Sequence, residues 1–277
     1  MTASDPSQSV NRQSPDSFED LAKLLVYGSD TKLLNFDFVW RGEPRTDRKS
    51  IPKIDRDFRE DRGLERRLAA ELLAVRRFRQ LAAMHLSSIE HRMLSEDMQA
   101  QVVLRHYGAP TRLLDWSESP WVALFFACRS SEDREGRVLA LNRASLEGVV
   151  RERFSAESKW HAVFPGEAAP RLMQKAYVEN AGAWVVCYHR HGEQFPRLVA
   201  QQGLFTVASK PWLDHWTTAQ DLLGRDGCIE IVISPALKEK CLWHLRAMGI
   251  TAASLFPGPD GAAEFVSTDL KLDLLRQ

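Results

Sequence analysis

An uninterrupted apolar segment at residues 121–128 constrains the fold of this chain more than any other feature. Ser119 is suited to cap a helix that begins at Pro120, and this helix carries apolar side chains on every side. Such a helix has no face for water, yet it is much shorter than the roughly 20 residues that a membrane span needs. We therefore expect it to lie at the centre of the fold, with four side chains directed inward: Trp121, Leu124, Phe125 and Cys128.

The other expected elements mix strands and helices without regular alternation. We expect strands at 36–40, 137–141, 183–189, 204–208, 228–233 and 251–256, and helices at 18–27, 64–86, 96–104 and 237–248. This order favours an α+β fold, with a mixed or antiparallel sheet flanked by helices, over a doubly wound parallel sheet. Because no repeat or linker divides the chain, we expect one domain at residues 17–277 after a polar, disordered leader at residues 1–16.

Two charged stretches carry further expectations. The stretch at residues 43–62 is charged and irregular, so we expect a loop that lies over the fold. In the helix at residues 64–86, Leu68, Leu72 and Val75 recur at helical spacing among several arginines. We expect these three side chains to face the core.

The composition limits the partners of this protein. Lys and Arg number 37, as do Asp and Glu, so the net charge is zero. A protein that binds nucleic acid mainly by neutralising phosphates usually has a basic excess, so we expect no strong non-specific nucleic-acid binding. The lack of a long apolar run predicts no membrane segment. The 4 cysteines show no CxxC spacing, which predicts reduced thiols and a cytoplasmic protein.

Several well-known catalytic motifs are missing. The sequence has no GxxxxGK(S/T) loop, no GxGxxG, no GxSxG and no HExxH. Readings as a P-loop enzyme, a Rossmann dehydrogenase, an α/β-hydrolase or a zincin therefore lose support. His189 and His191 share a strand face but have no evident third ligand, so we expect no metal site.

The segment Trp40-Arg41-Gly42 is the first candidate site. It follows an aromatic, β-branched stretch, so we expect a strand that delivers Arg41 and Gly42 at its end. Arg41 can offer a bidentate fork to a phosphate or carboxylate, and Gly42 lets the backbone approach a ligand or turn sharply. The alternative is a structural ion pair between Arg41 and an acid such as Asp115.

The second candidate site is the segment His106-Tyr107-Gly108-Ala109-Pro110-Thr111-Arg112-Leu113-Leu114-Asp115-Trp116. Gly108 and Pro110 favour a tight turn, and the segment leads into the N-terminus of the helix at residue 120. A helix N-terminus with polar side chains nearby suits an anion such as a pyrophosphate. We expect Arg41 to share one cleft with the cluster of Thr111, Arg112 and Asp115. The alternative is a buried pair of Arg112 with Asp115 that only holds the turn.

These segments resemble the FRG domain family, whose name describes an aromatic-Arg-Gly motif. The resemblance rests on Trp40-Arg41-Gly42, residues 106–127, Arg197 with Gln201-Gln202-Gly203-Leu204-Phe205, and residues 245–261, and it spans about residues 36–265. Three positions depart from the family pattern: Trp40 replaces the usual Phe or Tyr, Arg105 replaces Gln, and Pro259 replaces Leu. The family has no firmly assigned chemistry, and its members occur in bacteria and phages in settings that suggest conflict or defence.

A more distant resemblance connects this order of motifs with ADP-ribosyltransferases of the Arg-Ser-Glu type. It implies an ADP-ribosyltransferase-like fold, NAD as the cofactor, and Arg41 as a contact to NAD. The cluster at residues 111–115 would support the nicotinamide ribose, and Tyr107 or Trp116 would stack on nicotinamide. Either Gln202 or Glu230 would be the third site residue.

Two functions are compatible with these features. The first is an NAD-consuming transferase in bacterial or phage conflict, with Arg41, Gln202 and Glu230 as its catalytic residues. The second is a non-catalytic module that binds a nucleotide, nucleic acid or protein partner, with Arg105, Arg112 and the arginine-rich helix at residues 64–79 as recognition surface. In both, the expected ligand-binding residues are Trp40, Gly42, His106, Tyr107, Thr111, Arg112, Asp115 and Trp116.

Overall fold

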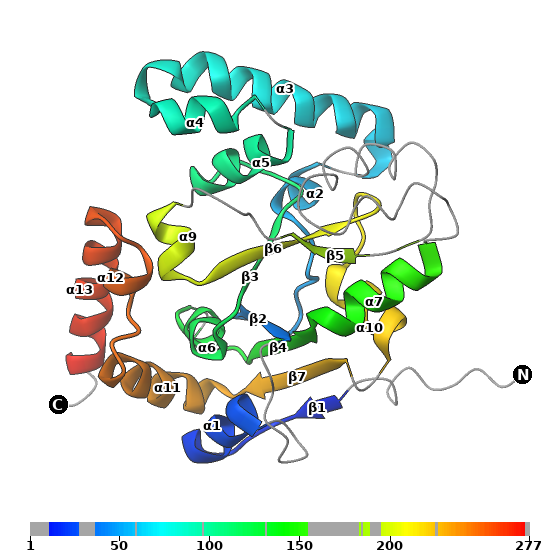
Figure 1. Cartoon of the computed structure of the whole chain (residues 1–277). Coiled ribbons are helices and arrows are strands. Elements are labelled where there is room, and N and C mark those ends of the chain that lie inside the picture. Colours follow the sequence, from blue (N-terminus) through cyan, green and yellow to red (C-terminus); the bar gives the residue numbers. More distant parts are fainter. Residues whose placement is uncertain are drawn as a thin grey trace, which may run out of the picture.

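A seven-stranded sheet with the order β1-β7-β4-β2-β3-β6-β5 forms the centre of the molecule (Figure 1). The computed structural model describes residues 11–27, 37–58, 60–95, 97–130, 132–154, 183, 185–188, 195–224 and 227–274. The strands are β1 (Asn11–Gln13), β2 (Phe38–Glu43), β3 (Leu114–Ser117), β4 (Gly136–Asn142), β5 (Val185–Tyr188), β6 (Gly203–Ala208) and β7 (Cys228–Ile233). β1 runs parallel to β7, and the other neighbours pair antiparallel. This mixed sheet with flanking helices confirms the α+β class.

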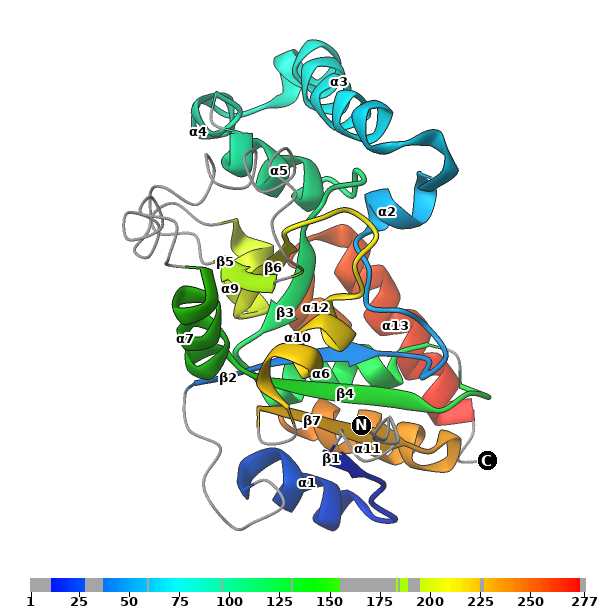
Figure 2. The same ribbon diagram turned by 90° about the vertical axis from the view of Figure 1, so that its right-hand side faces the viewer.

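Helices cover both faces of the sheet. They are α1 (Phe18–Tyr27), α2 (Lys53–Asp57), α3 (Leu64–Ala82), α4 (Ser88–Met93), α5 (Asp97–His106), α6 (Pro120–Cys128), α7 (Arg143–Phe154), α9 (Pro196–Ala200), α10 (His215–Leu223), α11 (Pro235–Ala247), α12 (Ala252–Leu255) and α13 (Pro259–Leu274). One core cluster joins α1, α6 and α11 to the sheet, and a second joins α5, α7 and α10 to it. Figure 2 shows α3, α4 and α5 as a separate layer at one end of the molecule. Within the described residues, no helix is both long and apolar enough to cross a membrane.

The apolar helix α6 is central, as expected. The Ser119 hydroxyl accepts a hydrogen bond from the Val122 amide at 3.4 Å, and Pro120 occupies the first turn. Leu124, Phe125 and Cys128 are buried, whereas Trp121 lies at the edge of the cluster and is only partly buried. Trp121 lies in the first turn of α6, and its ring centre is 6.3 Å from that of the buried Phe18 of α1.

Three of the expected elements need correction. Arg41 and Gly42 lie inside β2 and not at its end, because β2 pairs with β4 along its whole length. The segment expected as a strand at residues 251–256 is the helix α12, which begins with a capping box between Thr251 and Ser254. The stretch at residues 43–62 is not wholly irregular, since it contains α2 and a 3₁₀ turn, η2 (Glu60–Arg62).

The expected disordered leader also includes a strand. Residues Asn11–Gln13 pair with Ile229–Ile231 of β7, so these three residues belong to the sheet, while residues 1–10 lie outside the described residues. Asn11, Arg12 and Gln13 lack the β-branched and aromatic side chains typical of a strand. These three residues form a strand because they pair with the edge of the sheet at β7.

The helix α3 meets the expectation only in part. Arg67 and Glu71 are buried, whereas Leu72 is 61 % exposed. Arg67 donates to Asp55 at 2.7 Å and to Glu71 at 3.1 Å, so these charges are matched inside the protein. Val75 packs against the core as expected, together with Ala74 and Phe78, so the expectation is wrong for Leu72.

Candidate functional site

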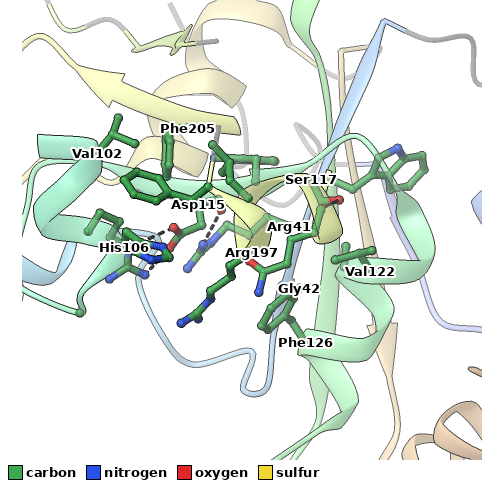
Figure 3. A pocket seen from close by; sticks show the side chains of 18 residues that line it. Arg41, Gly42, Val102, His106, Asp115, Ser117, Val122, Phe126, Arg197 and Phe205 are labelled. Atoms are coloured by element: carbon green, nitrogen blue, oxygen red, sulfur yellow. Dashed lines mark hydrogen bonds and ion pairs between the residues drawn. The ribbon is translucent and has the colours of Figure 1, made fainter. Parts of the chain in front are cut away.

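A pocket of about 290 Å³ lies between the sheet and three helices (Figure 3). β2 and β3 are in register at a single pair, Trp40 and Ser117, and the pocket lies where the two strands part. The ends of α5, α6 and α9 close it. The lining residues are Trp40, Arg41, Gly42, Val102, Arg105, His106, Gly108, Asp115, Trp116, Ser117, Val122, Ala123, Phe126, Phe195, Arg197, Leu198, Gln201 and Phe205.

Arg41 connects the two parting strands. Its Nη1 donates to the backbone carbonyl of Asp115 on β3 at 2.7 Å, and its Nε donates to Glu43 Oε1 at 2.9 Å. The buried Glu43 also accepts from Arg137 Nη2 at 2.7 Å. Although burial raises the pKa of Glu43, the two guanidinium groups outweigh it and lower that pKa overall. Glu43 is thus an ionised anchor that orients Arg41.

The carboxylate of Asp115 forms an ion pair with Arg105 and not with Arg41. Arg105 Nε donates to Asp115 Oδ1 at 3.0 Å, and Arg105 Nη2 donates to Oδ2. Loss of solvent contact acts to raise the pKa of Asp115, but Arg105, Arg41 and Arg197 together lower it. Of the expected cluster, Asp115 shares the pocket with Arg41, whereas Thr111 and Arg112 do not line it. The alternative of a structural ion pair for Arg41 holds with Glu43 and not with Asp115.

Arg197 is a pocket residue that sequence reasoning did not include in the site. It comes from the short helix α9, and its guanidinium lies 4.5 Å from the centre of the Phe256 ring. No side-chain hydrogen bond joins Arg197 to any residue in the described part of the chain. Figure 3 shows it near Arg41 and Asp115. Its only sequence signal was its place in the third segment that resembles the FRG family.

Aromatic rings form much of the remaining wall. His106 stacks on Phe195 with 4.0 Å between ring centres, and burial followed by the nearby Arg197 lowers the pKa of His106. His106 is therefore neutral near pH 7 and offers a flat ring edge. Trp116 is fixed by a 2.8 Å hydrogen bond from Nε1 to Thr206 Oγ1. Both rings were expected in the site.

Three expected ligand-binding residues do not line the pocket. Arg112 is buried, and its two 2.6 Å hydrogen bonds go to Glu71 and not to Asp115. Thr111 is fully buried beside it. Tyr107 is exposed, and its hydroxyl donates to Glu90 Oε1 at 2.5 Å, which together with burial raises its pKa to about 12.

We refer to Asp55, Arg67, Glu71 and Arg112 as the buried network. Its ion pairs have N–O distances of 2.6 to 3.1 Å, and they join α2, α3 and the turn before β3. For Glu71, burial acts to raise the pKa, but Arg112 and Arg67 outweigh burial, so the pKa is lowered overall. For Asp55, burial dominates and the pKa is raised. None of these four residues lines the pocket, although Arg112 lies only three residues before the pocket residue Asp115.

The structure places neither Gln202 nor Glu230 in the pocket lining. Gln202 is exposed in a turn with a positive φ of 45°, and its neighbour Gln201 lines the pocket instead. Glu230 is buried and accepts from Arg137 Nη1 at 3.3 Å. In the described part of the chain, no group of three or more His, Cys, Asp or Glu is arranged to hold a metal ion.

Residues 36–136 match the family model of the FRG domain. The chain contains an FRG domain. The matched range runs from just before β2 to the start of β4, and it supplies Arg41, Arg105 and Asp115 of the pocket. Arg197 and Gln201 come from beyond the matched range, so later elements complete the pocket of the FRG domain. No curated protein and no solved structure matches the chain.

Proposed function

We propose that this FRG-domain protein binds an anionic ligand with a planar ring, of the nucleotide class, in the pocket described above. NAD is the candidate ligand that the sequence resemblance suggested. The pocket offers the two features that a nucleotide needs, which are cationic donors for a phosphate and flat rings for a base. Its lining includes three arginines, Arg41, Arg105 and Arg197, and one carboxylate, Asp115.

The guanidinium of Arg197 is the observation that carries this proposal. Arg105 is neutralised by Asp115, and Arg41 is held by Glu43. Arg197 is exposed to solvent, lies over the Phe256 ring and makes no ion pair with a described residue. A guanidinium in that position is available to pair with the phosphate of an anionic ligand.

The pocket volume narrows the size of the ligand. Small-molecule sites usually enclose about 300–1,000 Å³, and this pocket of about 290 Å³ lies at the lower end. One nucleotide unit is therefore the expected occupant. A dinucleotide such as NAD would place one half inside and extend the other beyond the rim.

Thermal unfolding with a ligand panel tests the proposal. The panel contains NAD, ADP-ribose, AMP and nicotinamide riboside, of which the last lacks a phosphate. A ligand at about 100 times its Kd stabilises the folded state by about 2.7 kcal/mol, which raises the Tm by several degrees. We expect a rise with phosphate-bearing compounds only, and at least a tenfold loss of affinity in Arg197→Ala. Arg77→Ala, an exposed arginine outside the pocket, is the matched control. No shift with any nucleotide would refute the proposal.

Cleavage of NAD is a second candidate, and the carboxylate of Asp115 favours it. In such a reaction, nicotinamide leaves with the electron pair of the glycosidic bond, and an anion stabilises the oxocarbenium-like ribose. Water or a target nucleophile then forms the new bond and loses a proton. Asp115 is the one carboxylate among the described lining residues, and its lowered pKa keeps it ionised.

Nicotinamide release separates the two candidates. If the protein cleaves NAD, Asp115→Asn should reduce release at least 100-fold while NAD still raises the Tm. Release from the wild type that does not exceed the rate without protein would leave ligand binding as the function. Glu230→Gln provides the comparison for a carboxylate outside the pocket, and a large loss there would move the catalytic role to Glu230.

A further inference from the structure

The outward side of α3 exposes an apolar patch. Leu72 is 61 % exposed and Leu73 is 45 % exposed, and both lie in the middle of the helix. Ala69 and Arg76 are also exposed and lie one turn to either side, so the four side chains are neighbours on one surface. Leu81, in the last turn of α3, and Met84, just beyond it, are 81 % and 94 % exposed.

The same surface is strongly basic, although the chain as a whole has no net charge. Its exposed arginines are Arg66, Arg76, Arg77 and Arg79, and none of them forms an ion pair with a described residue. Glu65 is the acid of this helix that is exposed, because Glu71 belongs to the buried network. The leucines are thus surrounded by unmatched positive charge.

The opposite side of α3 is fixed in place. Arg67 and Glu71 bind Asp55 and Arg112 through the buried network, so the helix cannot rotate to bury Leu72 without breaking these ion pairs. Both views show α3 at the outer end of the molecule, where a partner can reach it (Figures 1 and 2). The exposed leucines are therefore a property of the folded chain.

We infer that the outward side of α3 is a docking surface for a protein partner that presents an apolar stripe flanked by acidic side chains. An amphipathic helix with Asp and Glu beside its apolar residues fits this description, since α3 is straight over about 28 Å. A second copy of this chain fits poorly, because four arginines would face four arginines. This surface is separate from the pocket and does not depend on the function proposed for it.

A synthetic peptide tests the charge and apolar requirements together. The probe is a helical peptide of about 20 residues with Leu at i, i+3, i+4 and i+7 and Glu on both flanks. The second peptide has Lys in place of every Glu. By fluorescence anisotropy, we expect the acidic peptide to bind at least tenfold more tightly than the basic one, with affinity that falls as salt rises.

Protein variants locate the binding surface. The double variant Leu72→Ser/Leu73→Ser should weaken the acidic peptide at least tenfold. The matched control is Val266→Ser/Leu270→Ser, which removes an exposed apolar pair from α13 and should change the Kd less than twofold. All four positions are exposed, so circular dichroism should show an unchanged fold. Equal binding of both peptides, or no effect of the α3 variant, would overturn the inference.

Two further measurements test the other occupants. Sedimentation velocity would detect a dimer that Leu72→Ser/Leu73→Ser dissolves, and this result would replace the acidic partner with a second copy. Co-sedimentation with vesicles of phosphatidylcholine and phosphatidylserine would detect a lipid surface as occupant. Leucine-dependent vesicle binding without binding of the acidic peptide would also overturn the inference.

Discussion

Beneath α3, arginines and carboxylates are sealed away from solvent, whereas in the pocket arginines face open space. In the buried network, Arg112 uses two short hydrogen bonds to Glu71 and has no access to a ligand. In the pocket, Arg197 rests on an aromatic ring with no described anion to bind. One short segment contributes to both regions, since Arg112 and Asp115 are three residues apart. Residue type alone therefore does not separate an arginine that stabilises from one that is available to bind.

The largest expected effect is on stability and concerns Arg112. Arg112→Ala removes a partner of the buried Glu71, and breaking a buried ion pair in this way costs about 3–5 kcal/mol. Urea denaturation followed by circular dichroism measures the loss, with the exposed Arg77→Ala as the control, expected within about 0.5 kcal/mol. A loss below about 1 kcal/mol, combined with weaker nucleotide binding, would show that Arg112 belongs to the pocket.

A smaller loss of stability is expected for Glu43→Gln. This change removes the charge that Arg41 and Arg137 share, and hydrogen bonds to charged groups contribute about 1.5–3 kcal/mol. Because Arg41 loses its anchor, nucleotide affinity should fall as well. Paired denaturation and titration data test this. If the variant is destabilised but its nucleotide affinity is unchanged, Glu43 does not contribute to ligand binding in the pocket.

The pH dependence of stability tests the assignment of Glu71 to the buried network. Glu71 and Glu43 have pKa values lowered from an ordinary 4.5, so their contributions are fully present above pH 4.5 and are lost as the pH falls through the lowered values. Asp55, whose pKa is raised, acts with the opposite sign. We expect stability to fall below pH 4.5 in the wild type and to fall less steeply in Glu71→Gln. Identical slopes would contradict the assignment to Glu71.

The smallest expected change in stability is for Arg197→Ala. Arg197 makes no described ion pair, so its removal should alter the free energy of unfolding by about 0.5 kcal/mol or less. Urea denaturation without ligand measures this directly. A loss of several kcal/mol would mean that Arg197 holds the structure together, and the contrast between the two regions would disappear.

The sequence predicted the elements whose residues carry local information. The helix α6 has a serine cap, a proline in its first turn and an apolar surface, and all three are visible without knowledge of the fold. The prediction that Arg41 and Asp115 lie in one cleft rested on two unusual polar segments, each of which was a candidate site. The match to the FRG domain covers both segments.

The remaining features depend on partners that are distant in the chain. Glu71 lies 41 residues from Arg112, and no spacing rule connects them. The apolar spacing in α3 predicted the inward position of Val75 but not the exposure of Leu72, because the buried Arg67 and Glu71 occupy part of the inward side. β1 contains no apolar residue and exists only through its pairing with β7. Arg197 lies in the pocket because its helix α9 directly precedes β6, and β6 pairs with the pocket strand β3.

The close contact between Gly42 and α6 sets limits on how this pocket can vary. A Cβ atom at residue 42 would lie 1.8 Å from the carbonyl oxygen of Ala123, so main chain touches main chain there. At Gly42 and Ala123 the pocket is consequently lined by closely packed backbone, whose shape a side-chain replacement cannot adjust. Variants with altered ligand choice should therefore arise on the opposite wall, at Val102, Leu198 or Phe205, where side chains supply the surface.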